Sequence, residues 1–200
     1  MLFRSGPALV RAAIGQDVTD EELGGATMHA SVSGTIDFKE PTDEKCIERL
    51  RSLVRKYSFN ATGTAKGKPY HNAERVYEVF TDKPGAQYDM RELIETLVDA
   101  GIRIDGGREV LSPDFDEYKA DYGQSIVCGY AKLGGHSVGI VANQKKLVQR
   151  TMQGGKAGPS KSTQMPGVIY DDSADKAARF IMDCNQRKVP IRSEEHTSEL

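Results

Sequence analysis

The chain has 200 residues, of which 38% are hydrophobic, 28% are charged and 20 are glycine. This length fits one compact domain of ordinary size or parts of two neighbouring domains. A formal net charge of −2, with both signs mixed along the chain, argues against a dedicated nucleic-acid binder, and no apolar run approaches the roughly 20 residues that span a bilayer.

The N-terminal part of the chain predicts two short helices and one strand. Gly6–Ile14 has apolar residues on one side at helical spacing, which indicates a helix. Thr19 and Glu22 have the spacing of a capping box and start a second helix, which we expect to end where Gly24–Gly25 takes a left-handed conformation. Met28–Val32 then predicts a strand closed by a Ser-Gly turn.

A longer helix is predicted over Asp43–Tyr57, where apolar residues recur at helical spacing opposite a charged face. The apolar stripe predicted for this helix is Cys46, Ile47, Leu50, Leu53, Val54 and Tyr57. Ala61–Gln87 breaks the pattern with glycines and prolines. We therefore interpret it as an interdomain linker that carries one short helix at Ala73–Phe80.

The next helix is predicted to begin after Asp89, a good N-cap with Glu92 three residues on, and to end at Gly101. The apolar stripe predicted for it is Met90, Leu93, Ile94, Leu97 and Val98. Arg103–Tyr122 is acidic and shows no regular period, which indicates a surface loop.

Two strands, Ser125–Leu133 and Ser137–Asn143, flank Gly134–Gly135 and predict a hairpin covered on both faces. Val168–Tyr170 predicts a strand, and Val189–Ile191 predicts the start of another. The stripe predicted for the intervening helix, from Ser173 onward, is Ala174, Ala177, Ala178, Ile181 and Met182. Strands and helices in this order predict an α/β fold with crossover helices.

Lys145–Gln164 contains five basic residues and no acidic one, so we expect a basic loop of net charge +5. The basic residues are Lys145, Lys146, Arg150, Lys156 and Lys161. The Gly154–Thr163 run resembles a phosphate loop, but it lacks the Gly-Lys-Ser/Thr spacing and the helix that must follow. A solvated surface loop and a loop that meets phosphates through its charge are the two interpretations.

The cysteines and histidines show no spacing typical of metal ligands. Cys46, Cys128 and Cys184 are far apart and lie in apolar stretches, which predicts buried, reduced thiols of a cytoplasmic protein and no disulfide framework. His29 follows a glycine turn and can line a pocket or make a structural hydrogen bond. No nucleophile elbow or pair of catalytic carboxylates stands out, so these residues alone name no reaction.

The two ends of the chain are expected to be artefacts. Residues 192–200, Arg-Ser-Glu-Glu-His-Thr-Ser-Glu-Leu, resemble a translated sequencing adapter. Residues 1–5 resemble a translation of the opposite strand of the same oligonucleotide. We therefore expect residues 6–191 to be an internal fragment of a longer protein, and both ends, His196 included, carry no weight for the fold or the site.

Several blocks of the sequence, taken in order, carry a family resemblance. They are Gly6 to Val10; Glu21 to Ala26 with His29 and Ser33-Gly34; Tyr88 to Glu92 with Ile94 to Asp99; Tyr122-Gly123 with Gly129 to Gly135 and Val138 to Gln144; and Gly167-Val168 with Ser173 to Phe180, Cys184 to Arg187 and Pro190. Together they resemble the carboxyltransferase (beta) subunit of biotin-dependent acyl-CoA carboxylases of the propionyl-CoA and methylcrotonyl-CoA type.

The resemblance implies a crotonase-like (ClpP/crotonase) spiral fold with parts of two related domains. Residues 6–60 would be the C-terminal part of the first domain, residues 61–87 the linker, and residues 88–191 the N-terminal part of the second. Residues 1–5 and 192–200 stay outside this division as the adapter-like ends.

The resemblance also implies a reaction, in which a carboxyl group moves from carboxybiotin to the α-carbon of an acyl-CoA. Paired backbone amides hold the enolate and the biotin oxyanion in such enzymes, which explains why no acid–base signature is visible. It further implies biotin carried by a partner subunit, acyl-CoA as substrate and no metal. Partners would be biotin carboxylase and biotin carrier subunits and further copies of the chain, as a hexamer. The resemblance implies no nucleic-acid or membrane partner. It implies a location in the cytoplasm, or in the mitochondrial matrix in a eukaryote.

The family's oxyanion-forming glycine segments are expected before Gly6 and after Ile191, so the resemblance implies no catalytic residue here and an inactive chain. The residues expected to edge the acyl-CoA or biotin pocket are Gly24, Gly25, Ala26, His29, Gly139, Ala142, Asn143 and Gln144. A scaffold role competes with ligand contact at each of them. Two other functions stay open. One is the carboxyltransferase subunit of a sodium-coupled, biotin-dependent decarboxylase, and the other is a non-catalytic CoA-binding module that folds and binds CoA on its own.

Overall fold

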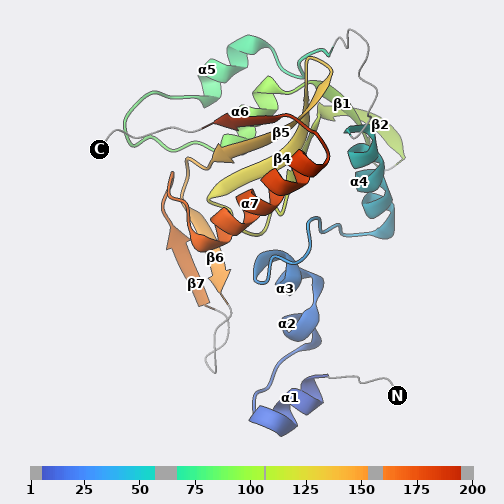
Figure 1. Cartoon of the computed structure of the whole chain (residues 1–200), viewed down its shortest axis with the longest axis vertical. Helices are drawn as coiled ribbons and strands as arrows, with labels where there is room; N and C mark the ends of the chain where they lie inside the picture. The colour runs from blue at the N-terminus through green and yellow to red at the C-terminus, as the bar shows by residue number, and fades with distance from the viewer. Residues whose placement is uncertain (1–5, 57–66, 106, 153–159, 195–200) are drawn as a thin grey trace.

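A mixed four-stranded sheet forms the centre of the protein (Figure 1). The computed structural model describes residues 6–56, 67–105, 107–152 and 160–194. The sheet order is β3–β4–β5–β8, with β3 to β5 antiparallel and β8 parallel to β5. These strands are β3 Phe115–Tyr118, β4 Ile126–Leu133, β5 His136–Asn143 and β8 Ile191–Glu194. Helix α7 (Asp171–Gln186) leads back to Ile191 at the start of β8, which confirms an α/β fold with a crossover helix; the other three residues of β8, Arg192 to Glu194, belong to the end expected to be adapter-like.

Helices cover both faces of this sheet. Alternate side chains of β4 point to opposite sides, as the strand period of two requires. Helix α6 (Met90–Leu97) packs on one face, and the buried residues there are Met90, Ile94, Val98, Phe115, Val127, Ala131, Ile140 and Ala142. Helices α7 and α4 (Asp43–Lys56) pack on the other, with Leu53, Tyr118, Ile126, Cys128, Tyr130, Phe180 and Cys184 buried. The prediction of a hairpin covered on two sides is confirmed.

The turn of that hairpin uses both glycines. Leu133 pairs with His136, and Gly134 and Gly135 between them have φ values of 59° and 83°. This left-handed backbone favours residues without a Cβ atom, so the sequence signal for the turn has a direct physical cause.

The acidic surface loop predicted over Arg103–Tyr122 is wrong. β1 (Ala100–Asp105) and β2 (Arg108–Pro113) form an antiparallel hairpin there, and β3 follows inside the main sheet. Helix α6 also ends before Gly101, because Val98 is already extended and the amide of Asp99 donates to Lys132 O. The hydrophobic period misses these strands because charged residues interrupt it, although β1 and β2 are neighbours in the chain and Asp105 pairs with Arg108 next to their turn.

The predicted basic loop contains a hairpin of its own. β6 (Val148–Met152) pairs with β7 (Ser160–Gln164), and the residues between them lie outside the described part of the chain. The strand predicted over Val168–Tyr170 is wrong, because among the described residues this segment joins no ladder and Tyr170 is the N-cap of α7.

Three short helices precede α4 and extend away from the sheet (Figure 1). They are α1 (Pro7–Ile14), α2 (Asp20–Gly24) and α3 (Ala26–Ser31). The capping box that starts α2 is confirmed, since the amide of Glu22 donates to Thr19 Oγ1 over 3.2 Å and the amide of Thr19 donates to Glu22 Oε2 over 2.9 Å.

The strand predicted over Met28–Val32 is wrong, because α3 occupies that stretch. Gly25 has φ −75° and caps α3 in an extended conformation, so the predicted left-handed end of α2 is wrong as well. The carboxylate of Glu21 accepts the amide of Thr27 over 2.9 Å, which satisfies a donor in the first turn of α3. A local side-chain contact thus outweighs the strand preference.

The remaining helices form where predicted, but two bury a different face. In α4 only Leu53 of the described stripe residues is buried, while Ile47, Leu50 and Val54 are half to two-thirds exposed. Helix α7 begins before Ser173 and buries Ser173, Lys176, Phe180 and Cys184, leaving Ile181 and Met182 exposed. Tyr57 lies outside the described residues. The short helix predicted after residue 73 is confirmed as a 3-10 turn, Ala73–Arg75, followed by α5 (Val76–Val79).

Candidate functional site

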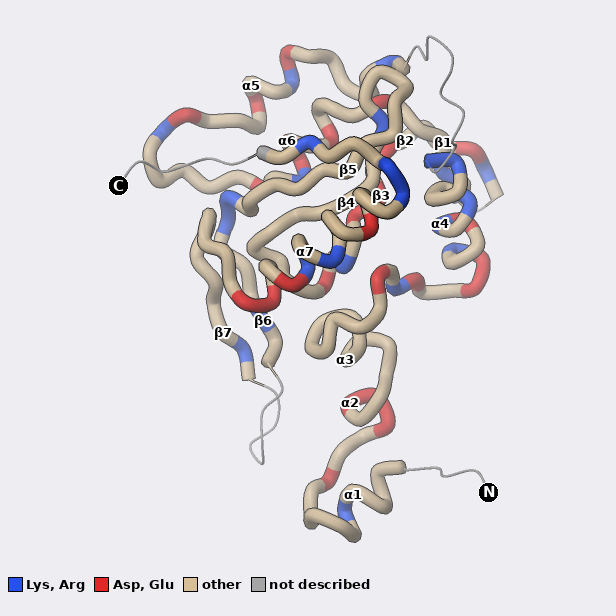
Figure 2. The backbone as a smooth tube through the Cα atoms, viewed as in Figure 1, with Lys and Arg blue, Asp and Glu red and all other residues tan. Residues whose placement is uncertain are grey.

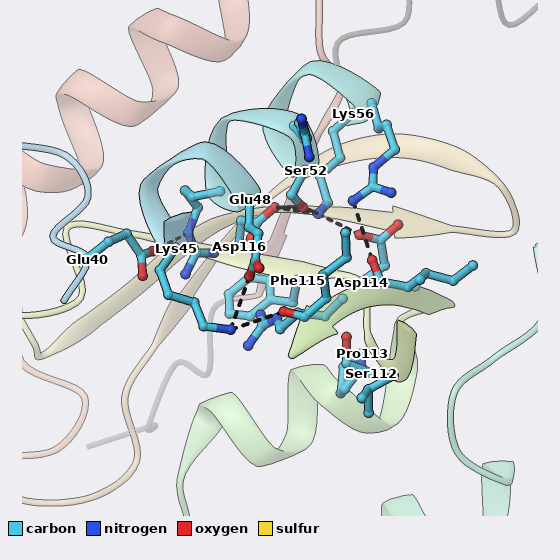
Figure 3. A pocket seen from close by; sticks show the side chains of 18 residues that line it. Glu40, Lys45, Glu48, Ser52, Lys56, Ser112, Pro113, Asp114, Phe115 and Asp116 are labelled. Carbon is cyan, nitrogen blue, oxygen red and sulfur yellow. Dashed lines mark hydrogen bonds and ion pairs between the residues drawn. The ribbon is translucent and has the colours of Figure 1, made fainter. Parts of the chain in front are cut away.

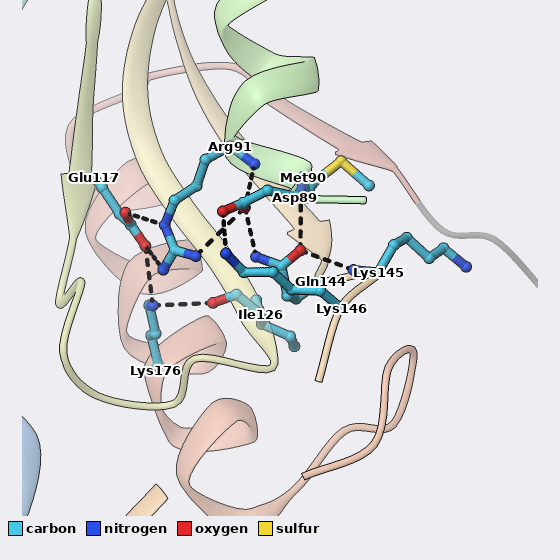
Figure 4. A network of polar contacts seen from close by, with 9 residues as sticks. All are labelled: Asp89, Met90, Arg91, Glu117, Ile126, Gln144, Lys145, Lys146 and Lys176. Atoms are coloured by element: carbon cyan, nitrogen blue, oxygen red, sulfur yellow. Dashed lines mark hydrogen bonds and ion pairs between the residues drawn. The ribbon is translucent and has the colours of Figure 1, made fainter. Parts of the chain in front are cut away.

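Gln144, at the end of β5, is fully buried and holds two parts of the fold together (Figure 4). Its side-chain oxygen accepts the amides of Met90 and Lys145, each over 2.9 Å, and its Nε2 donates to Asp89 Oδ1 over 2.8 Å. Its own amide donates to Ser125 O. Because every polar atom of the side chain has a protein partner, Gln144 fixes the start of α6 against the end of β5.

Asp89 connects this network to the charged residues around it. Its carboxylate caps α6 by accepting the amide of Arg91 over 3.0 Å, and Lys146 Nζ lies 2.5 Å away. Burial alone would raise the pKa of Asp89, but hydrogen bonds from Lys146, Gln144 and Arg91 outweigh burial and lower this pKa. Arg91 also makes a bidentate pair with Glu117, at 2.7 Å for both bonds.

The network reaches Lys176 of α7 in the protein interior (Figure 4). The side chain is completely buried, and Nζ donates to Ile126 O over 2.9 Å and lies 3.9 Å from Glu117 Oε1. Burial lowers the pKa of Lys176 to about 8, against the opposing attraction of Glu117. A charged ammonium in this position is therefore costly for the folded chain.

This cost predicts a pH dependence of stability. The unfolded chain holds the Lys176 proton more tightly than the folded one, so raising the pH from about 8 to 10.5 should stabilise the wild type relative to Lys176→Met, by up to about 3 kcal/mol. Urea unfolding of both proteins across this range measures the difference. Lys188→Met, which removes an exposed lysine, is the control and should show no such trend. A wild-type-to-Lys176→Met difference that stays flat with pH would contradict the assignment.

A second polar cluster lies beside a cavity of about 350 Å³ between α4 and the strands β1 to β3 (Figure 3). Asp116 of β3 is buried and accepts from Ser52 Oγ over 2.6 Å and from Lys56 Nζ over 2.5 Å, and it also pairs with Arg49. Lys56, equally buried, has Asp114 as a second partner at 2.5 Å. Burial alone would raise the pKa of Asp116, but Lys56, Ser52 and Arg49 lower it. The cluster therefore joins α4 to the main sheet.

The predicted pocket residues fall into two groups in different parts of the fold. Gly24, Gly25, Ala26 and His29 lie in or beside the short helices α2 and α3, and the other four lie on or just after β5. None of the eight lines the cavities beside α4, β1 or the end of α7. His29 Nδ1 lies 3.1 Å from both Ser33 Oγ and Thr35 Oγ1, which supports the structural interpretation of this histidine.

Three of the β5 group serve packing in this structure. A Cβ atom on Gly139 would lie 2.7 Å from Cys184 Sγ, so glycine lets α7 approach the sheet. Ala142 belongs to the core under α6, and Gln144 is the buried network residue. Asn143 is half-buried between them. These contacts favour the scaffold role for Gly139, Ala142 and Gln144, while their part in a pocket stays a prediction.

The positive charge of the predicted basic loop is partly balanced within the fold. Arg150 pairs with Asp171 and Asp172 at the start of α7, and Lys146 pairs with Asp89. Figure 2 shows basic residues on β6 and β7 and acidic ones at the start of α7. Lys156 lies outside the described residues.

The thiols differ in exposure. Burial raises the pKa of Cys128 to about 12 and that of Cys184 to about 11, so neither is a ready nucleophile. Cys46 is exposed, which corrects the prediction that all three are buried. Within the described ranges, no group of three His, Cys, Asp or Glu residues is arranged to hold a metal ion, and no helix is long and apolar enough to cross a membrane.

The sheet, its helix on each face and the crossover into β8 define an α/β protein of the crotonase-like class. The structure aligns with transcarboxylase 12S, solved as a hexamer with hydrolysed methylmalonyl-coenzyme A bound, at a TM-score of 0.68 and 28% sequence identity over 96% of this chain and 32% of that one. The carboxyl transferase domain model matches residues 1–192. The chain belongs to this family, as its sequence blocks indicate.

Curated relatives support the same membership. A probable methylcrotonoyl-CoA carboxylase beta chain of Drosophila melanogaster is 32% identical over 95% of this chain and 30% of its own length. A methylmalonyl-CoA decarboxylase alpha subunit of Propionigenium modestum is 29% identical over 95% of this chain and 32% of its own length. The chain thus spans about a third of the relatives that it matches.

Proposed function

We propose that this chain is part of the carboxyltransferase subunit of a biotin-dependent acyl-CoA carboxylase, which transfers a carboxyl group from carboxybiotin to the α-carbon of an acyl-CoA. The observation that carries the proposal is the family match over residues 1–192, together with relatives named as carboxylase beta chains. The sodium-coupled decarboxylase is the second candidate, because decarboxylase subunits match over the same residues.

We infer that the described residues alone do not complete a site for biotin. The two groups of pocket candidates lie in separate parts of the fold, and Gly139, Ala142 and Gln144 already pack against protein. What this part of the chain supplies is a rigid frame: the Gln144 network fixes the end of β5, and the Asp116 cluster fixes α4. Oxyanion-binding amides on segments outside residues 6–191 would complete the site.

The parent protein is expected to work in an assembly. We propose a biotin carboxylase and a biotin carrier as partners and further copies of the same subunit, in line with the hexameric transcarboxylase 12S. The cytoplasm, or the mitochondrial matrix in a eukaryote, is the proposed location, since mitochondrial carboxylase chains are among the relatives.

Labelled bicarbonate tests the reaction. The complete reading frame that contains this chain is produced with its biotin carboxylase and carrier, and labelled carbon is followed into acetyl-CoA, propionyl-CoA and methylcrotonyl-CoA. We expect ATP-dependent labelling of at least one acyl-CoA and none with the 200-residue chain alone. Loss of CO₂ from a carboxylated acyl-CoA without ATP would favour the decarboxylase. CoA binding by the 200-residue chain in calorimetry, with no transfer in either direction by the complete protein, would favour the binding module.

A further inference from the structure

A second cavity, of about 370 Å³, opens where the end of α4 meets the start of β1 and the turn of the β4–β5 hairpin. Its walls come from separate stretches of the chain: Arg55, Gly67, Lys68, Asp99, Ala100, Gly101, Ile102, Asp114, Lys132 and Gly135. The two hollows adjoin, since this cavity and the one beside Asp116 share four lining residues: Arg55, Gly101, Ile102 and Asp114. The β1–β2 hairpin borders both.

The two carboxylates of this cavity already have partners. Asp99 is buried, and its two oxygens accept the amides of Gly134 and Gly135 over 3.0 and 2.6 Å. Asp114 pairs with Lys56 at 2.5 Å. Among the described residues, neither carboxylate forms an ion pair with a cation that lines this cavity.

Three cations of the cavity have no such partner. Arg55, Lys68 and Lys132 come from different segments, and in the described part of the chain no carboxylate lies at ion-pair distance from any of them. Arg55 has one described hydrogen bond, to Ile102 O at 3.4 Å. The three cations outnumber the two carboxylates of the cavity, and Asp114 is balanced by Lys56, so the hollow carries a net positive charge that attracts an anion.

We propose that this cavity binds a phosphate group. Two lysines act as point charges and the arginine as a two-pronged donor, a combination suited to a phosphate that carries more than one negative charge. The amide of Gly135 already donates to Asp99, so the phosphate is held by the three cationic side chains. The cavity volume also leaves space for the organic group that carries the phosphate. The phosphate can come from free pyrophosphate or from a nucleotide-like ligand such as CoA.

Calorimetric titration of the 200-residue chain at low salt tests the site, with inorganic pyrophosphate as the first probe. Binding is expected and should weaken as salt is added, because screening reduces the attraction. Lys68→Ala and Lys132→Ala should each weaken binding about tenfold, the effect of losing one charge-assisted hydrogen bond. Lys83→Ala, an exposed lysine outside the cavity and the basic segment, is the matched control and should bind like the wild type.

CoA and dephospho-CoA, which lacks the 3′-phosphate, distinguish the two sources. CoA that binds more tightly than both dephospho-CoA and pyrophosphate identifies a nucleotide-like ligand, and equal binding of all three identifies the phosphate group alone as the ligand. Thermal unfolding checks that each variant folds. Lys68→Glu, a charge reversal at the same exposed position as Lys68→Ala, should abolish binding. Absence of pyrophosphate binding, or equal binding by the wild type and both alanine variants, would overturn the proposal.

Discussion

Replacing Asp116 with alanine is expected to destabilise the chain by about 3–5 kcal/mol, the usual cost of removing one partner from a buried ion pair. The variant leaves Lys56 in a buried position with Asp114 as its remaining carboxylate, and it removes acceptors from Arg49 and Ser52. The attachment of α4 to β3 depends on these bonds. Urea unfolding of wild type and Asp116→Ala at neutral pH measures the loss.

Two comparisons make this expectation specific. Asp175→Ala removes an exposed carboxylate on α7 that pairs with Arg179 and should cost less than about 1 kcal/mol. The double variant Lys56→Met/Asp116→Leu should recover much of the loss, because it removes both buried charges of the pair. Equal stability of Asp116→Ala and Asp175→Ala would show that the cluster does not hold α4.

Acid should reduce the effect of Asp116→Ala. The folded-state pKa of Asp116 is lowered, so this carboxylate stabilises the chain above its unfolded pKa, and the contribution is lost as the pH falls through the folded value. The wild type and the variant should therefore converge in stability at low pH.

Phe180→Ala is expected to cost about 3–5 kcal/mol, the range for deleting a buried aromatic ring. The ring is fully buried, with its centroid 4.9 Å from that of Tyr130 and 5.3 Å from that of Tyr118, so it joins α7 to β3 and β4. The cavity left behind borders on Gly139, where no side chain is available to fill it. Denaturant unfolding monitored by tyrosine fluorescence would report the loss.

Met182, two residues further along α7, is the matched control. Its side chain is 70% exposed, so Met182→Ala should change stability by about 0.5 kcal/mol or less. The sequence pattern predicts the opposite order, because it places Met182 on the buried stripe and leaves Phe180 out. If Met182→Ala were the more damaging change, α7 would bury the face that its periodicity suggests.

The sequence predicts the regular elements better than it predicts their burial. Helices such as α1 and α6 and the β4–β5 hairpin follow from periodicity, caps and turn glycines, all of which are local. The β1–β2 hairpin escapes prediction because its strands carry many charges, and α3 because a single contact from Glu21 decides it. The pairings of β3 with β4 and of β8 with β5 join more distant segments, which a local pattern does not show.

The same reason limits the prediction of the site. Gln144 is correctly singled out, yet its role as a buried link to Asp89 depends on a helix start more than fifty positions away in the chain. Lys176 and Asp116 pass for surface residues in the sequence, because charged side chains are rarely buried without a partner and the partners lie on other elements. One weak signal existed: Lys176 falls on the helix face that also carries Ser173 and Phe180.

The parallel pairing of β8 with β5 leads us to expect an order of assembly. Neighbouring strands β3, β4 and β5 close short loops, so their meander can form early from nearby chain. β8 meets Gly139 and Ile140 only after the β6–β7 hairpin and the whole of α7 have been placed, and closing that long connection costs entropy before any ladder bond repays it. We therefore expect β8 to join a sheet that has already formed. Until β8 joins, the edge of β5 stays open to pairing with neighbouring chains.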